Sequence, residues 1–363
     1  MLSANTASEV IAVGLDARKG RILAAIVSQY IQTGEPVGSK SICDLEGINV
    51  SSATVRNEMA ALFDMGLLEQ PHTSAGRIPS HLGYRVYIDS LMRCDPLTQH
   101  ERDELDALFN VGDPDPDRLI EDATERLAQY TGCATVSATM TARSVYVKRV
   151  GLIKVDETTV VILVMANNGV IKNKVVRVGF RVTQDICDFF TNFANGMLRG
   201  KSLYEISLLY LNSVAVSLGE YSRLLTPLLA AIYELCKEIY DGQFYRRGET
   251  NLLSYHELEA AARELFTLLE SRERVTELLY PQGSLAPGVK VAIGKENREQ
   301  ELCDTALIVA RYRIGSDSAG AIGIIGPVRL PYPRLIPHLE YFANTLGKLL
   351  SDTYRSEASS PQQ

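Results

Sequence analysis

The sequence predicts an α+β protein with more than one domain, and three observations support this prediction. The chain has 363 residues, enough for two or three domains of ordinary size, and 46% of them are hydrophobic. Apolar residues in the first 90 positions recur at helical spacing. Strand-like runs begin before residue 180 and resume after residue 288. This order indicates one antiparallel sheet that is interrupted by a mainly helical insertion.

The N-terminal region predicts a helix-turn-helix. The apolar face of residues 21–31 predicts a helix that ends at Gly34, and a short second helix fits residues 39–46, with Ser39 as N-cap and Gly47 after its end. A third helix starts after the N-cap Ser51 and closes at Gly66. Its inward residues recur at i, i+4 and i+7: Val55, Met59 and Leu62. In a helix-turn-helix the second of the paired helices enters the major groove of DNA.

The outer face of that third helix supplies the candidate base contacts. Arg56 can pair with guanine and Asn57 with adenine, each worth about 1–3 kcal/mol of discrimination when the contact is bidentate. Ser52 and Thr54 lie beside them in the first two turns, and the helix N-terminus, capped by Ser51, favours a nearby phosphate.

The segment after this helix has the pattern of a wing. Residues 67–70 form an apolar strand, and PHTSAGRIP at residues 71–79 supplies a small polar tip and a return. The tip residues suit phosphate or minor-groove contact: His72, Thr73, Ser74 and Arg77. With Ser39 and Lys40 they are expected to position the DNA backbone. Ser80 can cap the next helix, which has one apolar face: Tyr84, Tyr87, Ile88 and Leu91.

The charge of the chain leaves the DNA-binding hypothesis open. The net charge is −7, and between Asp16 and Arg93 eight basic residues are matched by eight acidic ones. This charge argues against wholesale coating of nucleic acid, because phosphate binding needs local positive charge. It does not exclude one small DNA-reading module on an acidic body. The alternative is a structural helical bundle whose polar residues form a solvated face.

Three segments identify a family resemblance. ATVRNEMAALFDMGLLEQPHTSAGRIPSHLGYRVYID at residues 53–89 closely resembles the N-terminal module of HrcA, the bacterial heat-inducible transcription repressor family. NLLSYHELE at 251–259 and AGAIGIIGPVRLPYPRLI at 319–336 resemble the same family, and the resemblance runs from about residue 18 to residue 352. It implies a homodimeric repressor of chaperone genes that binds an inverted repeat of double-stranded DNA called CIRCE. The chaperonin GroEL would modulate it.

The remaining chain predicts a body with an insertion. Residues 95–118 resemble a linker with one short helix, and residues 119–130 a longer helix. The Asn167–Gly169 turn indicates a hairpin. Strands are expected at residues 134–139, 144–155, 159–166, 170–178, 289–294, 306–314 and 321–326, before a terminal helix at 334–351. The family comparison implies that this body is GAF-like.

The insertion has dense aliphatic faces, which favour either an internal core or a dimer interface. Helices are expected at residues 203–215, 224–240 and 255–270, with a polar β or turn segment, YDGQFYRRGETN, at 240–251. We favour dimerisation, since a segment this apolar would expose surface if it stood alone. The expected domains are 1–94 (winged helix-turn-helix), 95–198 and 284–355 (GAF-like), 199–283 (inserted dimerisation domain) and 356–363 (disordered tail).

Enzyme, cofactor and membrane functions find no support in the sequence. GVKVAIGK at residues 288–295 superficially resembles a phosphate loop, but five residues separate its glycines and Glu296 replaces the required hydroxyl. The spacing of Gly320, Gly323 and Gly326 is not that of a dinucleotide site. Six separated cysteines and five scattered histidines predict no metal site.

No apolar run approaches the about 20 residues that span a bilayer, and no basic leader precedes a hydrophobic stretch, so we expect a cytoplasmic protein. Two rival functions stay open. One is a GAF-like sensor that controls DNA binding through a small-molecule pocket, and the other is a structural scaffold without sequence preference.

Overall fold

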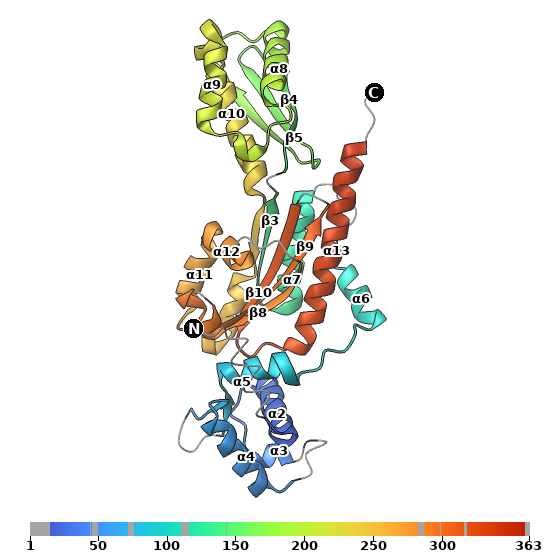
Figure 1. Ribbon diagram of the computed structural model, residues 1–363, viewed down its shortest axis with the longest axis vertical. Coiled ribbons are helices and arrows are strands. Elements are labelled where there is room, and N and C mark those ends of the chain that lie inside the picture. The colour runs from blue at the N-terminus through green and yellow to red at the C-terminus, as the bar shows by residue number, and fades with distance from the viewer. Residues whose placement is uncertain are drawn as a thin grey trace.

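The computed structural model describes residues 15–43, 45, 50–71, 76–109, 116–142, 144–281, 287–297, 299–315 and 318–359, with only the backbone for 353–359. Three units follow one another along the longest axis, with the N-terminal helices at one end, a five-stranded sheet in the middle and a three-stranded sheet at the other end (Figure 1). The mixture of helices and antiparallel sheets confirms the predicted α+β class.

In the part of the chain that the structure describes, the N-terminal unit packs four α-helices and a π-helical turn beside a two-stranded ribbon. Its elements are α2 (Ala17–Thr33), α3 (Ser39–Cys43), α4 (Ser52–Asp64), β1 (Leu68–Glu69), β2 (Ile78–Pro79), α5 (His81–Val86) and the π-helical turn η1 (Tyr87–Leu91). As predicted, α2 stops at Gly34, which has φ +70° and donates its N–H to the Tyr30 carbonyl. Gly47, the expected end of the second helix, lies outside the described residues.

The middle unit is a five-stranded antiparallel sheet in the order β7-β3-β10-β9-β8. Its strands are β3 (Ala134–Thr141), β7 (Phe244–Arg247), β8 (Gly288–Ile293), β9 (Thr305–Ile314) and β10 (Ser318–Pro327). Side chains of β9 alternate between two cores: Ile308 packs with α13 (Tyr332–Ser359), whereas Leu307 packs with α11 (Ala262–Glu270) and α12 (Arg272–Leu279). Helices therefore cover both faces of this sheet.

Shorter elements complete the middle unit. Helix α7 (Pro116–Thr131) packs against β3 and α13, and α6 (Gln99–Asp106) lies against α13. Among the described residues, 3-10 turns connect the remaining segments: η4 (Glu249–Ser254), η5 (His256–Leu258), η7 (Gly294–Glu296) and η8 (Gln300–Leu302). Helix α13 continues to Ser359, past residue 356, where we expected a disordered tail to begin.

The third unit has its own core, formed by residues between Val145 and Ile239. A meander of β4 (Val147–Lys154), β5 (Thr159–Ala166) and β6 (Ile171–Arg177) packs against helices. The helical elements are α8 (Gln184–Leu198), η2 (Leu203–Glu205), α9 (Leu208–Ser217), η3 (Gly219–Tyr221) and α10 (Ser222–Asp241). Figure 1 shows this unit at the end of the molecule opposite α4.

The expectation of a single interrupted sheet is wrong. Strands β4–β6 form a sheet of their own, while β7, which lies inside the expected insertion, pairs with β3 through Thr135 and Arg247. A strand has two edges, and those of β3 are taken by β10 and β7, so β4 has no edge of β3 to join. The chain between β3 and β7 is therefore the inserted part, and α11 and α12 belong to the middle unit.

Candidate nucleic-acid interface

Helix α4 is fixed at its start by the predicted cap. The Ser51 hydroxyl accepts a hydrogen bond from the Thr54 N–H at 3.2 Å, and the two hydroxyl oxygens lie 3.0 Å apart. The three inward residues are buried as predicted: Val55, Met59 and Leu62. One side of α4 is thus held by the core, and the other side remains at the surface.

The two best candidates for base contact lie on that exposed side. Arg56 and Asn57 are both exposed, and neither has a hydrogen-bond or ion-pair partner among the residues that the structure describes. Their neighbour Glu58 is instead engaged, because its carboxylate lies 3.2 Å from Lys19 Nζ and 3.8 Å from Arg18 on α2. The acidic charge on α4 is therefore partly balanced by α2.

Helix α3 is joined to the start of α4. The hydroxyl oxygens of Ser39 and Ser52 lie 3.1 Å apart, and both residues are half-buried. Lys40, the adjacent residue, is exposed. The structure thus brings together the candidates Ser39, Lys40, Ser51, Ser52, Thr54, Arg56 and Asn57 on one pair of helices.

The predicted wing is described only at its base. His72, Thr73 and Ser74 lie outside the described residues, so their roles stay predictions. Arg77 exchanges two backbone hydrogen bonds with Val37, each 2.9 Å long, and its guanidinium lies 4.9 Å from the centre of the Phe63 ring. Arg77 therefore also braces the ribbon against the end of α4.

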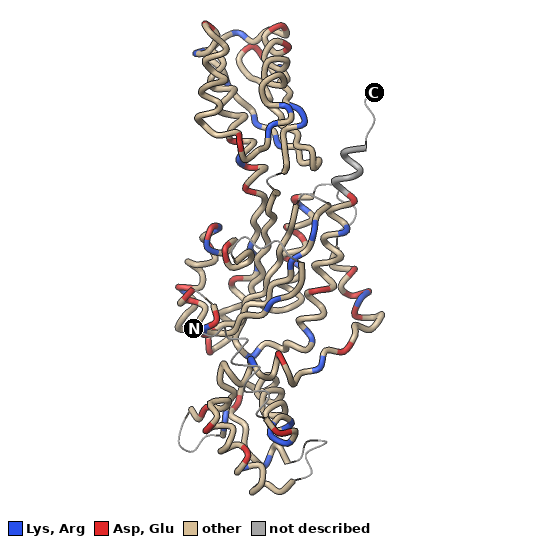
Figure 2. Tube along the Cα trace, viewed as in Figure 1, with Lys and Arg blue, Asp and Glu red and all other residues tan. Residues whose placement is uncertain are grey.

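Acidic and basic residues both occur over the N-terminal unit, as Figure 2 shows. Binding through this unit alone would be weak, since its balanced charge supplies little general attraction to phosphate. A helix of 13 residues is about 20 Å long, and its side-chain diameter of about 10–12 Å matches the major groove. The arrangement suits groove recognition by a few side chains.

The described residues contain no candidate metal site, and the cavities beside the central sheet are small. These residues contain no group of three or more His, Cys, Asp or Glu side chains that could hold a metal ion. Two cavities beside the central sheet have volumes of about 140 and about 20 Å³. Both lie below the roughly 300–1,000 Å³ typical of small-molecule sites. No helix among the described residues is long and apolar enough to cross a membrane.

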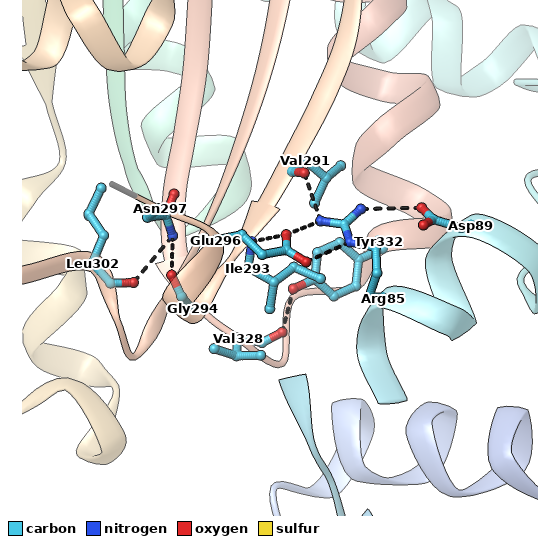
Figure 3. Close-up of polar contacts among 10 residues, drawn as sticks. All are labelled: Arg85, Asp89, Val291, Ile293, Gly294, Glu296, Asn297, Leu302, Val328 and Tyr332. Atoms are coloured by element: carbon cyan, nitrogen blue, oxygen red, sulfur yellow. Dashed lines mark hydrogen bonds and ion pairs between the residues drawn. The ribbon is translucent and has the colours of Figure 1, made fainter. Parts of the chain in front are cut away.

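One functional candidate was missed from the sequence, namely Arg85. Only 7% of this residue is exposed, and its guanidinium donates to the Glu296 carboxylate and the Val291 carbonyl of the middle unit (Figure 3). The available signal was an arginine between apolar residues on α5, next to the buried Tyr84.

Comparisons with known proteins identify the family of this chain. A family model described as "HrcA protein C terminal domain" matches residues 117–336. The heat-inducible transcription repressor HrcA of Thermoanaerobacter pseudethanolicus is 35% identical over 350 residues, which cover 94% of this chain and 99% of the relative. This chain belongs to the HrcA family.

Other matches extend over similar lengths. The HrcA repressor of Clostridium tetani is 34% identical over 347 residues, covering 94% of this chain and 98% of the relative. A crystal structure described only as a hypothetical protein has a TM-score of 0.66 at 24% identity and covers 93% of this chain and 99% of that one. The HrcA match therefore includes the N-terminal unit as well as the C-terminal domain, and the structural match supports the fold.

Proposed function

We propose that this HrcA-family chain is a DNA-binding transcription repressor and not an enzyme. Its N-terminal unit would act as a winged helix-turn-helix, with α4 in the major groove. One observation carries the proposal. The capped helix α4 buries one face in the core and exposes Arg56 and Asn57 on the opposite face. The repressor names of the relatives support the same function.

We infer that the repressor acts as a homodimer through the third unit. Helix α9 has no charged residue, and large apolar side chains are exposed on it and after it: Leu208, Leu209, Val216, Tyr221 and Leu224. A hollow of about 270 Å³ lined by Phe189, Tyr221 and Leu224 continues this surface. A second copy of the chain would remove these side chains from water.

The family resemblance supports the finer proposals. The operator would be the inverted repeat CIRCE, since a two-fold dimer presents two copies of α4 to two half-sites. The middle unit would be GAF-like in fold. GroEL would modulate the repressor by raising the folded, DNA-competent fraction after heating. Equal operator affinity of heated protein with and without GroEL would contradict that feedback.

A gel-shift titration tests the proposed function. The full chain is mixed with a CIRCE duplex, with a scrambled duplex of the same composition and with a single half-site. We expect the intact repeat to bind at least tenfold more tightly than the scrambled duplex, with the half-site in between. Equal affinity for all three duplexes would favour the structural scaffold instead.

A further inference from the structure

The junction between the N-terminal and middle units contains a charge cluster around the buried Arg85, whose partners Glu296 and Asp89 remain partly in contact with solvent. Arg85 on α5 donates from Nε to Glu296 Oε1 at 2.8 Å, and its Nη2 also contacts the other oxygen of that carboxylate. Nη2 further donates to the Val291 carbonyl at 2.8 Å, and Nη1 donates to Asp89 at 3.2 Å. All of these groups converge on the guanidinium in Figure 3.

The partner carboxylate is itself held in place. Glu296 accepts a hydrogen bond from the Ile293 N–H at 2.9 Å, which fixes it within the turn after β8. In the same turn Gly294 has φ +52°, and a Cβ atom added there would lie 2.3 Å from the His81 ring of α5. The segment that superficially resembles a phosphate loop therefore ends in a close contact with the N-terminal unit.

The Arg85 guanidinium contacts Glu296 and Val291 on one side and Asp89 on the other, so it fixes the orientation of the Glu296 carboxylate. The planar fork of arginine matches a carboxylate in a bidentate manner, which lysine cannot reproduce. The buried rings of Tyr84 and Tyr332 meet edge to face beside the cluster, with centroids 6.1 Å apart. A loosened pair would leave charge buried without compensation, so the junction resists rotation.

We propose that the Arg85–Glu296 pair fixes the angle at which the DNA-binding unit is held on the body, and that it thereby sets the half-site spacing the dimer accepts. The inference rests on the proposed function. Arg85 and Glu296 are positioning residues, because Figure 1 places α5 at the junction and α4 toward the free end of the N-terminal unit.

The physical reason is the geometry of a two-fold dimer. Two rigidly held copies of α4 match half-sites at one separation and one helical phase. A loose junction would let each unit turn independently, so the second half-site would be met at a lower effective concentration. Such a dimer binds its best operator more weakly, but its affinity falls less when the spacing between the half-sites changes.

The DNA experiment compares Arg85→Lys and Glu296→Gln with the wild type. Each protein is titrated with a half-site, with the CIRCE repeat and with repeats whose spacer is two or five base pairs longer. We expect half-site affinity within twofold of wild type, at least tenfold weaker binding to CIRCE and a flatter spacing profile. Arg247→Lys is the matched control, since Arg247 pairs with Glu121 inside the middle unit.

Folded, dimeric variants that keep the wild-type spacing profile would overturn the inference. Half-site affinity that falls in the same proportion as CIRCE affinity would overturn it too, because Arg85 would then act within the N-terminal unit. A wild-type protein without preference for the repeat would contradict the proposed function instead.

A second measurement tests the junction without DNA. Spin labels at Ala60 of α4 and Thr267 of α11, both exposed, report the distance between the two units. The background carries Cys43→Ser, Cys94→Ser and Cys303→Ser, because these three free cysteines are not fully buried. We expect one narrow distance distribution for the wild type and at least a twofold broader one for Arg85→Lys. Equal widths would show that the pair does not fix the angle, whatever the DNA result.

Discussion

In the proposed function, Arg56 is the side chain on which sequence recognition would most depend. It is exposed at the second turn of α4, while the buried Val55 and Met59 fix the rotation of the helix beneath it. We expect Arg56→Ala to cost about 1–3 kcal/mol on the intact operator and to relax the preference for one base pair. Titrations against a set of single-base operator variants measure both effects, and unchanged selectivity would contradict the assignment.

Lys40 is expected to contact the DNA backbone, unlike Arg56, which is expected to contact bases. It is exposed on α3 beside Ser39 and is expected to contact phosphate, which carries no sequence information. Lys40→Ala should weaken binding to specific and scrambled duplexes alike and reduce the salt slope by about 1. Affinities measured over a range of salt concentrations check this. A loss confined to the operator would instead give Lys40 a role in base recognition.

The ribbon element depends on close backbone approach at Gly76. A Cβ atom there would lie 2.3 Å from the Val37 carbonyl oxygen, whereas nothing lies within 4 Å of the corresponding position at Gly38. We expect Gly76→Ala to destabilise the N-terminal unit by about 1–3 kcal/mol, because the backbone must shift. Amide hydrogen exchange of α2 in the full chain reports this loss. Gly38→Ala is the control, and equal behaviour of the two variants would refute the argument.

Helix α6 is attached to the body through a buried histidine. Arg334 donates to the Tyr130 hydroxyl at 3.1 Å, which leaves the hydroxyl proton for His338 Nδ1 at 3.0 Å. His338 Nε2 then carries the ring proton and lies 3.4 Å from Glu101 of α6. Burial lowers the pKa of His338 below its usual value, against the opposing effects of Glu101 and Glu104.

This lowered pKa predicts a loss of stability in acid. The unfolded chain binds a proton to His338 near pH 6.5, whereas the folded chain binds it only at lower pH, so stability falls as pH drops below about 6.5. Wild type and His338→Gln are compared by urea unfolding between pH 7.5 and pH 5. We expect the wild type to have the larger free energy of unfolding at pH 7.5 and this difference to shrink as pH falls. A difference that stays constant or grows would contradict a lowered pKa of His338 in the folded chain.

At the scale of the whole molecule, local features were predictable and strand partners were not. The helix caps at Ser51 and Ser80 and the stop at Gly34 follow from local chemistry, and the structure has all three. The assignment of β4–β6 to a separate sheet depends on which edges of β3 are free, which no local pattern specifies. Arg85 was missed for the same reason, because Glu296 lies 211 positions away along the chain.

The apolar surface of α9 carries the final prediction, which concerns assembly. Leu209 is 82% exposed, so Leu209→Asp should leave the folded subunit intact while placing a charge in the proposed dimer interface. We expect the dissociation constant of the dimer to rise at least tenfold, about 1.4 kcal/mol, as measured by sedimentation equilibrium. Leu253→Asp is the control, since Leu253 is an exposed leucine of η4 in the middle unit. In Leu209→Asp, weaker dimerisation should be accompanied by weaker operator binding, while half-site affinity stays constant. A dimer of Leu209→Asp as tight as the wild type would place the interface on another surface.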